Sequence, residues 1–509
     1  MSPQKKLLLL GTFVHSKTPQ DLDFFHNAGI AVDAQGKIAA MERGGAADGS
    51  GSEIKTRLLE KLGWSEAEVD VTEAAQGQFF FPGFVDTHIH APQYANAGIF
   101  GKSSLLDWLE TYTFPLESSL KDLAKARRVY ARCVRRTLSH GTTTAAYFAT
   151  IDVAATNLLA DLCLSMGQRA FVGRVCMDAT EVNPAYYRDA SAEESLEATR
   201  QTIDHVRKMD PGFDIVSPIL TPRFAPSCSR EAMARLAQLH RETGLPIQTH
   251  ISENLGEIQL VARLFPEADS YADVYDRFGL LTPRTVLAHA VHISDEEAEL
   301  IARKGSKVSH CPCSNTCLTS GPARVRWMWD KGIDVGLGTD VSGGYSPSIL
   351  EAARQAAMVS RHVAMGIDMP NDGGAAADDA AATGKDEAKD DAKERAKLTV
   401  EEVLYLATRG GARCVGLEDK IGGFAVGMEW DAQLVSLGQV GDDGDVREQD
   451  ADEGPVDVFG WETWEDRLAK WLYNGDDRNT KRVWVKGRLV HRRGRGEGKD
   501  CEVKRKDHS

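Results

Sequence analysis

Cysteine, surplus basic residues and long apolar runs are all scarce in this sequence. Its 509 residues include only nine cysteines at irregular spacing, which excludes a disulfide scaffold and fits a reducing cytoplasm. Lysine and arginine (60) are outnumbered by aspartate and glutamate (75), and the net charge of −15 argues against a nucleic-acid partner. No apolar run approaches the ~20 residues that a membrane-spanning helix needs. We therefore expect a cytoplasmic protein without nucleic-acid or membrane partners.

What the chain does contain is typical of a large soluble enzyme. Hydrophobic residues make up 42% and charged residues 27% of it, and the length suffices for a large buried core. The segment KKLLLL at residues 5–10 resembles a signal peptide, but Gly11 and Thr12 follow it directly. A first β-strand is therefore the better interpretation. Residues 1–78 as a whole read as short strands joined by polar turns, the N-terminal part of a small β domain.

A run of β-prone apolar residues ends in two histidines. The sequence FFFPGFVDTHIH predicts a strand over residues 79–90 that is buried on both faces. Successive side chains of a strand point to opposite faces, so His88 and His90 point the same way. Such a pair is either half of a zinc site or two hydrogen-bonded core histidines.

From this strand onward, strands and amphipathic helices alternate. Helical stretches such as residues 120–139, 192–208, 230–243 and 295–304 lie between the strands. Eight strands are expected at residues 79–90, 142–147, 170–177, 215–222, 246–252, 285–290, 307–311 and 334–338. This α/β pattern predicts a TIM-like (β/α)8 barrel, with a doubly wound sheet as the alternative.

Polar residues collect where the predicted strands end, and this favours the barrel. His88 and His90 follow the first strand, and Arg223 follows the fourth. The other ends carry His250 and Glu253, His289, and Asp340. Since active sites of such barrels lie at the carboxyl ends of the strands, a single zinc ion would explain this set.

The ordered set of motifs resembles the guanine deaminases of the amidohydrolase superfamily. The resemblance rests on the HxH after a PG-containing strand and on the later His, His and Asp. It also rests on LDWLETYTFPLE at residues 106–117, the SHCP pattern around His310, GLGTDVSGGY at residues 336–345 and LYNGDDRNTKRVWV at residues 472–485. These segments extend over most of the chain.

The resemblance implies one zinc ion per subunit, held by His88, His90, His250 and Asp340. Members with two metals bridge them through a lysine after the fourth strand, and residues 215–222 contain none. By the same resemblance His289 lies near the metal-bound water. Asp340, His289 and Glu253 are then the catalytic residues. Because His250 and Glu253 are three residues apart, we predict that the strand ends at about Ser252.

The family resemblance also implies which residues bind the base: Gln93, Arg223, Phe224 and Glu253. Arg223 offers five donors and no acceptor, which suits the 6-oxo group of guanine and opposes the 6-amino group of adenine. Gln93 can both donate and accept. Trp108 and Phe114 either line this pocket or pack in the core.

Several other motifs have a structural interpretation. The CPCSNTC run at residues 311–317 suggests a metal knuckle, but it has no second ligand pair, and we predict a strand end and loop. The other class of zinc base deaminase uses HxE with a later PCxxC; here the spacing is HxxE and PCxxxC, so that interpretation fails on both counts. His292 is expected to be structural, and His310 is expected to support the pocket from behind.

The C-terminal third completes the domain organisation. The barrel is expected over residues 79–418, with a low-complexity insertion at residues 372–397. Residues 419–509 complete a discontinuous, β-sandwich-like domain together with residues 1–78, and they end in a basic tail at residues 492–506.

These features predict zinc-dependent hydrolysis of guanine to xanthine and ammonia. The alternatives are a deaminase of another oxopurine, a pterin or a triazine, and, in another class, a non-catalytic scaffold of the same fold. The resemblance further implies a homodimer, because members of the family commonly form one.

Overall fold

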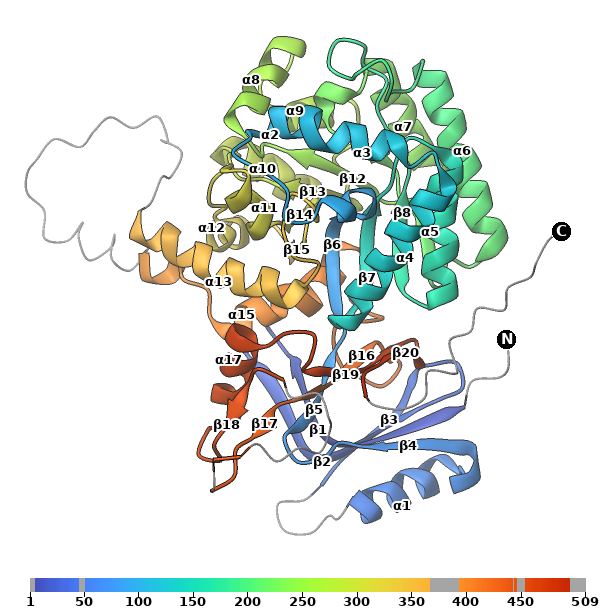
Figure 1. The fold of residues 1–509 in the computed structure, drawn as a ribbon, viewed down its shortest axis with the longest axis vertical. Helices are drawn as coiled ribbons and strands as arrows, with labels where there is room; N and C mark the ends of the chain where they lie inside the picture. Colours follow the sequence, from blue (N-terminus) through green and yellow to red (C-terminus); the bar gives the residue numbers. More distant parts are fainter. Residues whose placement is uncertain (1–4, 45–50, 367–392, 443, 446–453, 495–509) are drawn as a thin grey trace, which may run out of the picture.

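The computed structural model describes residues 5–44, 51–366, 393–442, 444–445 and 454–494. The insertion predicted at residues 372–397 lies outside the described residues except for 393–397, and the basic tail does so beyond residue 494. An α/β body of parallel strands and helices occupies the upper part of Figure 1, and a mainly β part lies below it. None of the helices in the described ranges is both long and apolar enough to cross a membrane.

Strands from both ends of the chain form one eight-stranded sheet in the lower part. Its order is β20-β19-β16-β5-β1-β2-β3, with β4 paired to β1. Helix α1 (Gly51–Leu62) packs on it through Ile54 and Leu58. The strands are β1 (Lys6–Ser16), β2 (Leu22–Val32), β3 (Ile38–Arg43), β4 (Val69–Glu73), β5 (Gln78–Pro82), β16 (Ala432–Ser436), β19 (Thr480–Val485) and β20 (Arg488–Arg492).

Each of the eight strand positions predicted for the upper part contains a strand. Parallel pairing joins neighbours in chain order. The strands are β6 (Phe84–His90), β7 (Thr142–Phe148), β8 (Arg169–Gly173), β9 (Val175–Cys176), β10 (Val216–Pro218), β11 (Thr221–Pro222), β12 (Ile247–Ile251), β13 (Thr285–His289), β14 (Lys307–His310) and β15 (Val335–Leu337).

The strand predicted over residues 79–90 is in fact two strands. β5 pairs with β1 and β16 of the lower sheet, whereas β6 pairs with β7 of the upper part. Gly83 separates them, and a Cβ there would lie 2.1 Å from the Thr143 hydroxyl. Only glycine allows this close approach, so the apolar run passes from one sheet into the other at that residue.

The described parallel strands of the upper part, β6 to β15, are hydrogen-bonded as three sheets, not as one continuous ring. Pro218 and Pro222 end β10 and β11, and proline has no backbone N–H to continue a ladder. Two contacts nevertheless bridge the gaps. Leu220 forms an isolated parallel bridge with Ile247, and the Asp340 N–H donates to the His88 carbonyl at 2.9 Å, next to β15.

The helices around these strands begin and end where capping residues occur. Ser229 caps α7 by accepting the Ala232 N–H, and Gly244 ends it in the left-handed conformation, both common helix boundaries. The principal helices are α4 (Leu123–Ser139), α5 (Val153–Met166), α6 (Ala192–Met209), α7 (Arg230–Thr243), α8 (Leu255–Leu264), α9 (Tyr271–Arg277), α10 (Asp295–Lys304), α13 (Ile349–Met365) and α17 (Trp464–Asn474). The four helices predicted by periodicity are therefore confirmed to within a few residues.

The upper and lower parts share one hydrophobic core. Phe79 and Phe81 of β5 pack edge-on against Trp471 of α17, with ring centroids 5.4 and 5.1 Å apart. The same cluster includes Leu287 of β13. A buried ion-pair cluster also joins the two parts: Arg169, the first residue of β8, contacts Glu429 and Asp431.

Candidate active site

The backbone turns sharply where β12, β13 and β15 end. β12 ends at Ile251, so the predicted end near Ser252 is confirmed. Ser252, His289 and Asp340 have φ angles of 47°, 75° and 46°, a region that non-glycine residues seldom adopt and that is enriched at functional sites. The turn at Ser252 brings Glu253 to the same pocket as His250, which a continuous strand would not do.

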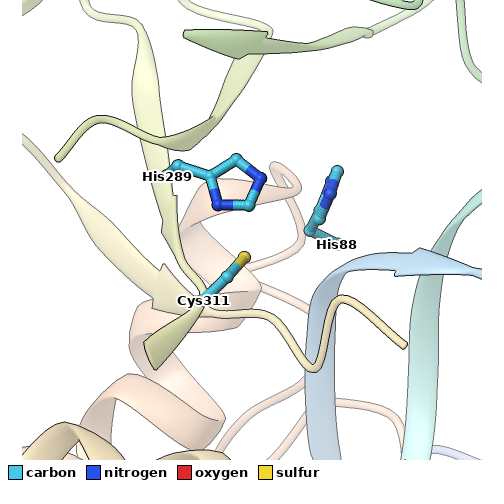
Figure 2. Close-up of side chains that lie close together, drawn as sticks. All are labelled: His88, His289 and Cys311. Atoms are coloured by element: carbon cyan, nitrogen blue, oxygen red, sulfur yellow. The ribbon is translucent and has the colours of Figure 1, made fainter. Parts of the chain in front are cut away.

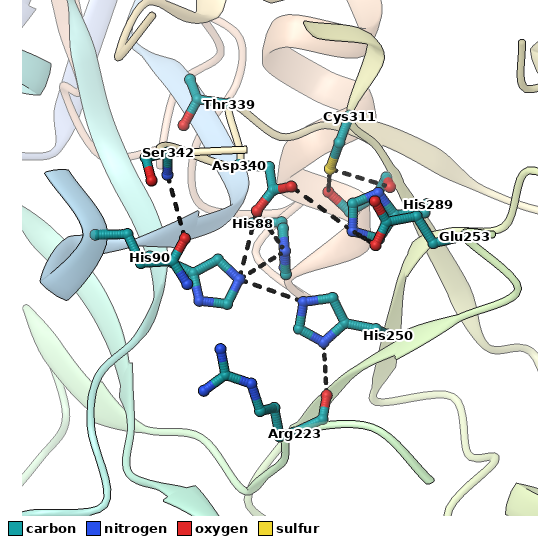
Figure 3. Close-up of polar contacts among 12 residues, drawn as sticks. His88, His90, Arg223, His250, Glu253, His289, Cys311, Thr339, Asp340 and Ser342 are labelled. Carbon is teal, nitrogen blue, oxygen red and sulfur yellow. Dashed lines mark hydrogen bonds and ion pairs between the residues drawn. The ribbon is translucent and has the colours of Figure 1, made fainter. Parts of the chain in front are cut away.

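Three histidines from two strands converge on one point, as Figure 3 shows. The Nε2 atom of His90 lies 3.2 Å from that of His88 and 3.3 Å from that of His250. Asp340 Oδ1 lies 3.1 Å from His88 Nε2 and 3.4 Å from His90 Nε2. The structure thus brings together all four residues predicted to hold the metal, although they are far apart in sequence.

The donor set fits a divalent cation. The His250 Nδ1–H donates to the Arg223 carbonyl at 2.6 Å, and this fixes its Nε2 as a lone pair directed at the other two rings. Burial and the neighbouring rings lower the pKa of both His90 and His250 well below the usual value. Both rings are therefore neutral, and a neutral imidazole can donate a lone pair to a cation. Three imidazoles and one carboxylate are ligands that suit zinc and also accept iron.

Asp340 carries the negative charge of this cluster. Burial opposes its ionisation, but the adjacent His88 and His289 outweigh burial and lower the pKa of the Asp340 carboxyl. The carboxylate is therefore ionised at neutral pH. It is the single charged donor among the four, and its other oxygen, Oδ2, lies 3.7 Å from His289 Nε2.

Glu253 and His289 form an acid–base pair beside the four donors. Their side chains are nearly fully buried, with 3.4 Å between Glu253 Oε2 and His289 Nε2. Burial raises the pKa of Glu253 to about 7. Burial also opposes charge on His289, but the Glu253 and Asp340 carboxylates outweigh it and raise the pKa of the imidazole. The His289 Nδ1–H donates to Asn315 at 2.9 Å, which turns Nε2 toward Glu253.

The residues predicted to bind the base line a pocket next to the histidines. Gln93, Arg223, Phe224 and Glu253 all border it, as does Trp108. Of the two aromatic residues left open by the sequence, Trp108 therefore lines the pocket. Phe114 does not border it and instead packs behind, 5.1 Å below the Arg223 guanidinium.

Sequence reasoning missed three buried acids around the site. Glu117 of α3 (Phe114–Ser119) accepts two N–H groups of Arg223. Asp86 accepts the Thr339 hydroxyl and N–H and so ties β6 to the segment after β15. Glu257 borders the pocket and accepts the Glu253 N–H at 2.9 Å. Glu117 ends the LDWLETYTFPLE run, which was the available signal, since an acid among apolar residues requires a buried partner.

The cysteine run forms a strand end, as predicted, but a short helix follows it in place of the predicted loop. Cys311 follows β14, and α11 (Pro312–Cys317) begins directly after it. Figure 2 shows the Cys311 thiol beside the rings of His289 and His88, and these three buried groups lie close enough to share a cation. Burial raises the pKa of the thiol well above its usual value, so sulfur is a poorer ligand here than the imidazoles.

The two remaining histidines lie outside the pocket. His292 Nε2 donates to the Ser320 carbonyl at 2.7 Å, which agrees with the expected structural role. His310 borders a separate cavity of about 340 Å³, together with Arg324 and Trp327. His310 also lies close enough to His289 for their charges to interact, so its support of the pocket from behind stays a prediction.

Comparisons with known proteins agree with this geometry. The amidohydrolase family model matches residues 79–490. A probable guanine deaminase of Schizosaccharomyces pombe is 46% identical over 483 residues, 95% of this chain and 83% of that protein. The guanine deaminase of Homo sapiens is 38% identical over 486 residues, 94% of this chain and 95% of that protein. A solved guanine deaminase from C. acetobutylicum with guanine in its active site has a TM-score of 0.77 and 30% identity, covering 96% of this chain and all of that one.

Proposed function

This chain belongs to the amidohydrolase family, and from that premise we propose that it hydrolyses guanine to xanthine and ammonia. One observation carries the proposal. Three of the four proposed metal donors, an acid with a pKa of about 7 and an arginine held by Glu117 border the same pocket. The fourth donor, His88, lies directly behind, with its Nε2 3.2 Å from His90 Nε2 and 3.1 Å from Asp340 Oδ1. Relatives of nearly equal length with this activity in their names support the choice of substrate.

We assign the metal to His88, His90, His250 and Asp340, with one zinc ion per subunit. Zinc held by these residues would supply a water of lowered pKa, and so a nucleophile at neutral pH. The support is the three converging Nε2 atoms and the adjacent carboxylate oxygen. Asp340 is ionised, so it can accept the proton that water loses.

Glu253 is assigned to supply a proton to the ring nitrogen beside the carbon that bears the amino group. That proton prevents negative charge from accumulating on the aromatic ring when the water oxygen forms its bond to carbon. A pKa of about 7 keeps a substantial fraction of Glu253 protonated at neutral pH. The amino group then leaves as ammonia after receiving a proton, and the carbon keeps the oxygen.

His289 orients these groups and stabilises charge. Its Nε2 lies between Glu253 Oε2 (3.4 Å) and Asp340 Oδ2 (3.7 Å), so one imidazole can contact both proton carriers. Arg223, Gln93 and Phe224 are assigned to hold the base, with Arg223 directed at the 6-oxo group. A site built on such a hydrogen bond can reject the wrong analogue by about 10⁴–10⁵-fold.

We also propose the complete architecture of the family for this chain. The parallel strands would close into a (β/α)8 barrel over residues 79–418, and residues 1–78 and 419–509 would form one small β-sandwich-like domain. Two features support this: the Asp340–His88 backbone bond between the first and last strands, and the pairing of β5 with β1 and β16. A cytoplasmic homodimer completes the proposal.

The test is ammonia release from guanine, guanosine, adenine, cytosine, a pterin and a triazine by protein loaded with zinc and, separately, with iron. We expect turnover of guanine, with adenine at least about 10⁴-fold poorer. Faster turnover of the pterin or the triazine would assign the site to that alternative. No turnover of any substrate by protein that holds one metal per chain would indicate the scaffold.

A further inference from the structure

The Glu117 carboxylate is the centre of the hydrogen-bond network behind the base pocket. Its side chain is fully buried, and it accepts from Arg223 Nη1 at 2.7 Å and from Arg223 Nη2 at 3.2 Å. It also accepts from Gln93 Nε2 at 2.8 Å and from the Tyr187 hydroxyl at 2.7 Å. These four bonds occupy the acceptor sites of both carboxylate oxygens.

The network fixes which way the Gln93 amide faces. An ionised carboxylate only accepts hydrogen bonds, so the NH₂ group of Gln93, and not its oxygen, must face Glu117. The Gln93 Oε1 is thereby turned the other way, where it lies 3.4 Å from the Ser342 N–H. Gln93 borders the pocket, and its carbonyl oxygen has a second lone pair with which it can accept from a bound base.

The same carboxylate cancels the charge of Arg223. The guanidinium is nearly fully buried, and the adjacent Glu117 keeps it ionised and raises its pKa although burial opposes this. Two of its five N–H groups donate to Glu117 and one faces the Met177 sulfur at 3.9 Å, which leaves two that these partners do not use. The pair as a whole is neutral, so the pocket offers directional donors without net positive charge.

We propose that Glu117 is a positioning residue that makes the pocket select neutral oxopurines over ionised ones. The inference deepens the proposed function and rests on it. Xanthine has an imide where guanine has an amidine, so xanthine loses a proton more readily. A neutral Arg223–Glu117 pair gives the xanthine anion no extra attraction, and the product is released while the neutral substrate is held by the same bonds.

A purely structural ion pair would not have these consequences. The chain contains one for comparison: Arg174 and Asp189 are paired and buried, but neither residue borders the base pocket. Glu117 differs because both of its main partners, Arg223 and Gln93, border the pocket. Its effect must therefore appear in ligand binding and not only in stability.

The experiment compares Glu117→Gln with the intact enzyme at pH 6 to 9. The measured quantities are zinc content, kcat and KM for guanine, and the inhibition constant of xanthine. We expect unchanged zinc and a KM raised by about 10- to 100-fold, by analogy with residues that orient metal ligands. Xanthine should inhibit the variant more strongly relative to guanine, and this difference should grow with pH as the xanthine anion forms.

Two matched variants separate charge from geometry. Glu117→Asp keeps the charge but shortens the side chain, so KM should rise without any new preference for xanthine. Glu110→Gln removes an exposed acid from the adjacent helical turn (Leu109–Thr113) and should change neither KM nor xanthine inhibition.

If Glu117→Gln does not fold, the comparison is between Arg223→Gln and the double variant Glu117→Gln/Arg223→Gln. Xanthine binding should weaken more steeply with pH in the single variant, where the Glu117 charge is unopposed.

Several results would overturn the proposal. One is a Glu117→Gln enzyme whose KM and xanthine inhibition match those of Glu110→Gln. A second is a Glu117→Asp enzyme in which xanthine inhibition strengthens as much as in Glu117→Gln. A third is xanthine binding that weakens equally with pH in Arg223→Gln and in the double variant. Failure of the proposed function is distinguishable, because it appears as absent ammonia release from guanine in the intact enzyme. Calorimetric binding of guanine and xanthine then still tests the role of Glu117.

Discussion

Two buried polar clusters lie at opposite ends of the parallel strands, and they differ in whether their polar atoms are satisfied. Near the start of β8, the Arg169 guanidinium contacts Asp431 at 3.1 Å, Glu429 at 2.5 Å and the Asp214 carbonyl at 2.7 Å. At the carboxyl ends, the Nε2 atoms of His88, His90 and His250 face one another, and His289 Nε2 is buried without a hydrogen-bond partner. The two clusters are otherwise similar in burial and in charge content.

This difference separates a buried cluster that stabilises the fold from one that is a candidate functional site. Buried polar groups in folded proteins are nearly always hydrogen-bonded, so an orphan in a charged cluster indicates an absent partner. The Arg169 cluster is complete and joins the parallel strands to the lower sheet. Under the proposed function, the histidine cluster would be completed by a cation and a substrate. Four experiments test this contrast.

The largest effect is expected from His250→Ala. Loss of one of three convergent imidazoles should reduce the zinc content from about one per chain to near zero, and ammonia release should fall to background. Elemental analysis and the ammonia assay measure both. His292→Ala is the matched control, because that ring bonds only to the Ser320 carbonyl, and it should keep both zinc and turnover. Full zinc content in His250→Ala would contradict the assignment.

Glu253→Gln should keep zinc and lose turnover. The amide cannot deliver a proton, so kcat should fall by about 10²–10⁴-fold, the usual contribution of a general acid–base group. Steady-state kinetics and metal analysis on the same sample provide the measurement. Glu296→Gln, an exposed change on α10, is the control. Near-normal kcat in Glu253→Gln would remove Glu253 from the mechanism.

Arg169→Met should destabilise the protein without changing the chemistry. Glu429 and Asp431 would stay buried without a counter-charge, which costs about 3–5 kcal/mol of unfolding free energy. The exposed pair Arg230–Glu267 is the comparison, and Arg230→Met should cost at most about 1 kcal/mol. Denaturant midpoints and kcat of the folded fraction are measured together. Loss of kcat in folded Arg169→Met would contradict a purely structural role of the Arg169 cluster.

The smallest effect concerns His15 in the lower sheet, whose Nδ1 has a backbone partner while its Nε2 has no hydrogen-bond partner among the described residues. Burial, followed by the Arg409 charge, lowers its pKa to about 4, and Nδ1 accepts the Phe424 N–H at 3.1 Å. Between pH 6.5 and 4, His15 is protonated in the unfolded chain but stays neutral in the folded protein. The contribution of His15 is thus complete above pH 6.5 and is lost as pH falls to 4, at most about 3 kcal/mol.

The measurement for His15 is the unfolding free energy at pH 7 and pH 4.5. His15→Asn can accept the same N–H without titrating, so it should lose less stability on acidification than the unaltered protein. Equal pH dependence of the two proteins would show that His15 does not contribute.

Local patterns in the sequence were sufficient for most of the fold. Alternation of apolar runs and amphipathic segments located the parallel strands and the main helices, because each helix carries its own capping signal, such as Ser229 and Gly244 for α7. The pattern could not divide residues 79–90. Phe79 and Phe84 are both buried apolar residues, and apolarity alone does not tell which of two sheets a residue joins.

The candidate site was predictable where it depends on strand ends and not where it depends on distant partners. His88 and His90 follow from period-two alternation, and the turn at Ser252 follows from the spacing of His250 and Glu253. The partner of Arg223 did not follow. Glu117 is 106 residues away from it, and no local period links a short helix to the end of a strand.

The sequence by itself determined the order of strands and helices and the kinds of metal-binding and acid–base groups at the strand ends, because these depend on short-range periodicity and on side-chain chemistry. Only the tertiary structure decided which donors share a point, which way Gln93 faces and which buried charges are already paired. Those outcomes depend on distances between segments that are far apart in the chain. Polar groups at such distances interact more strongly when they are buried than when they are exposed to water.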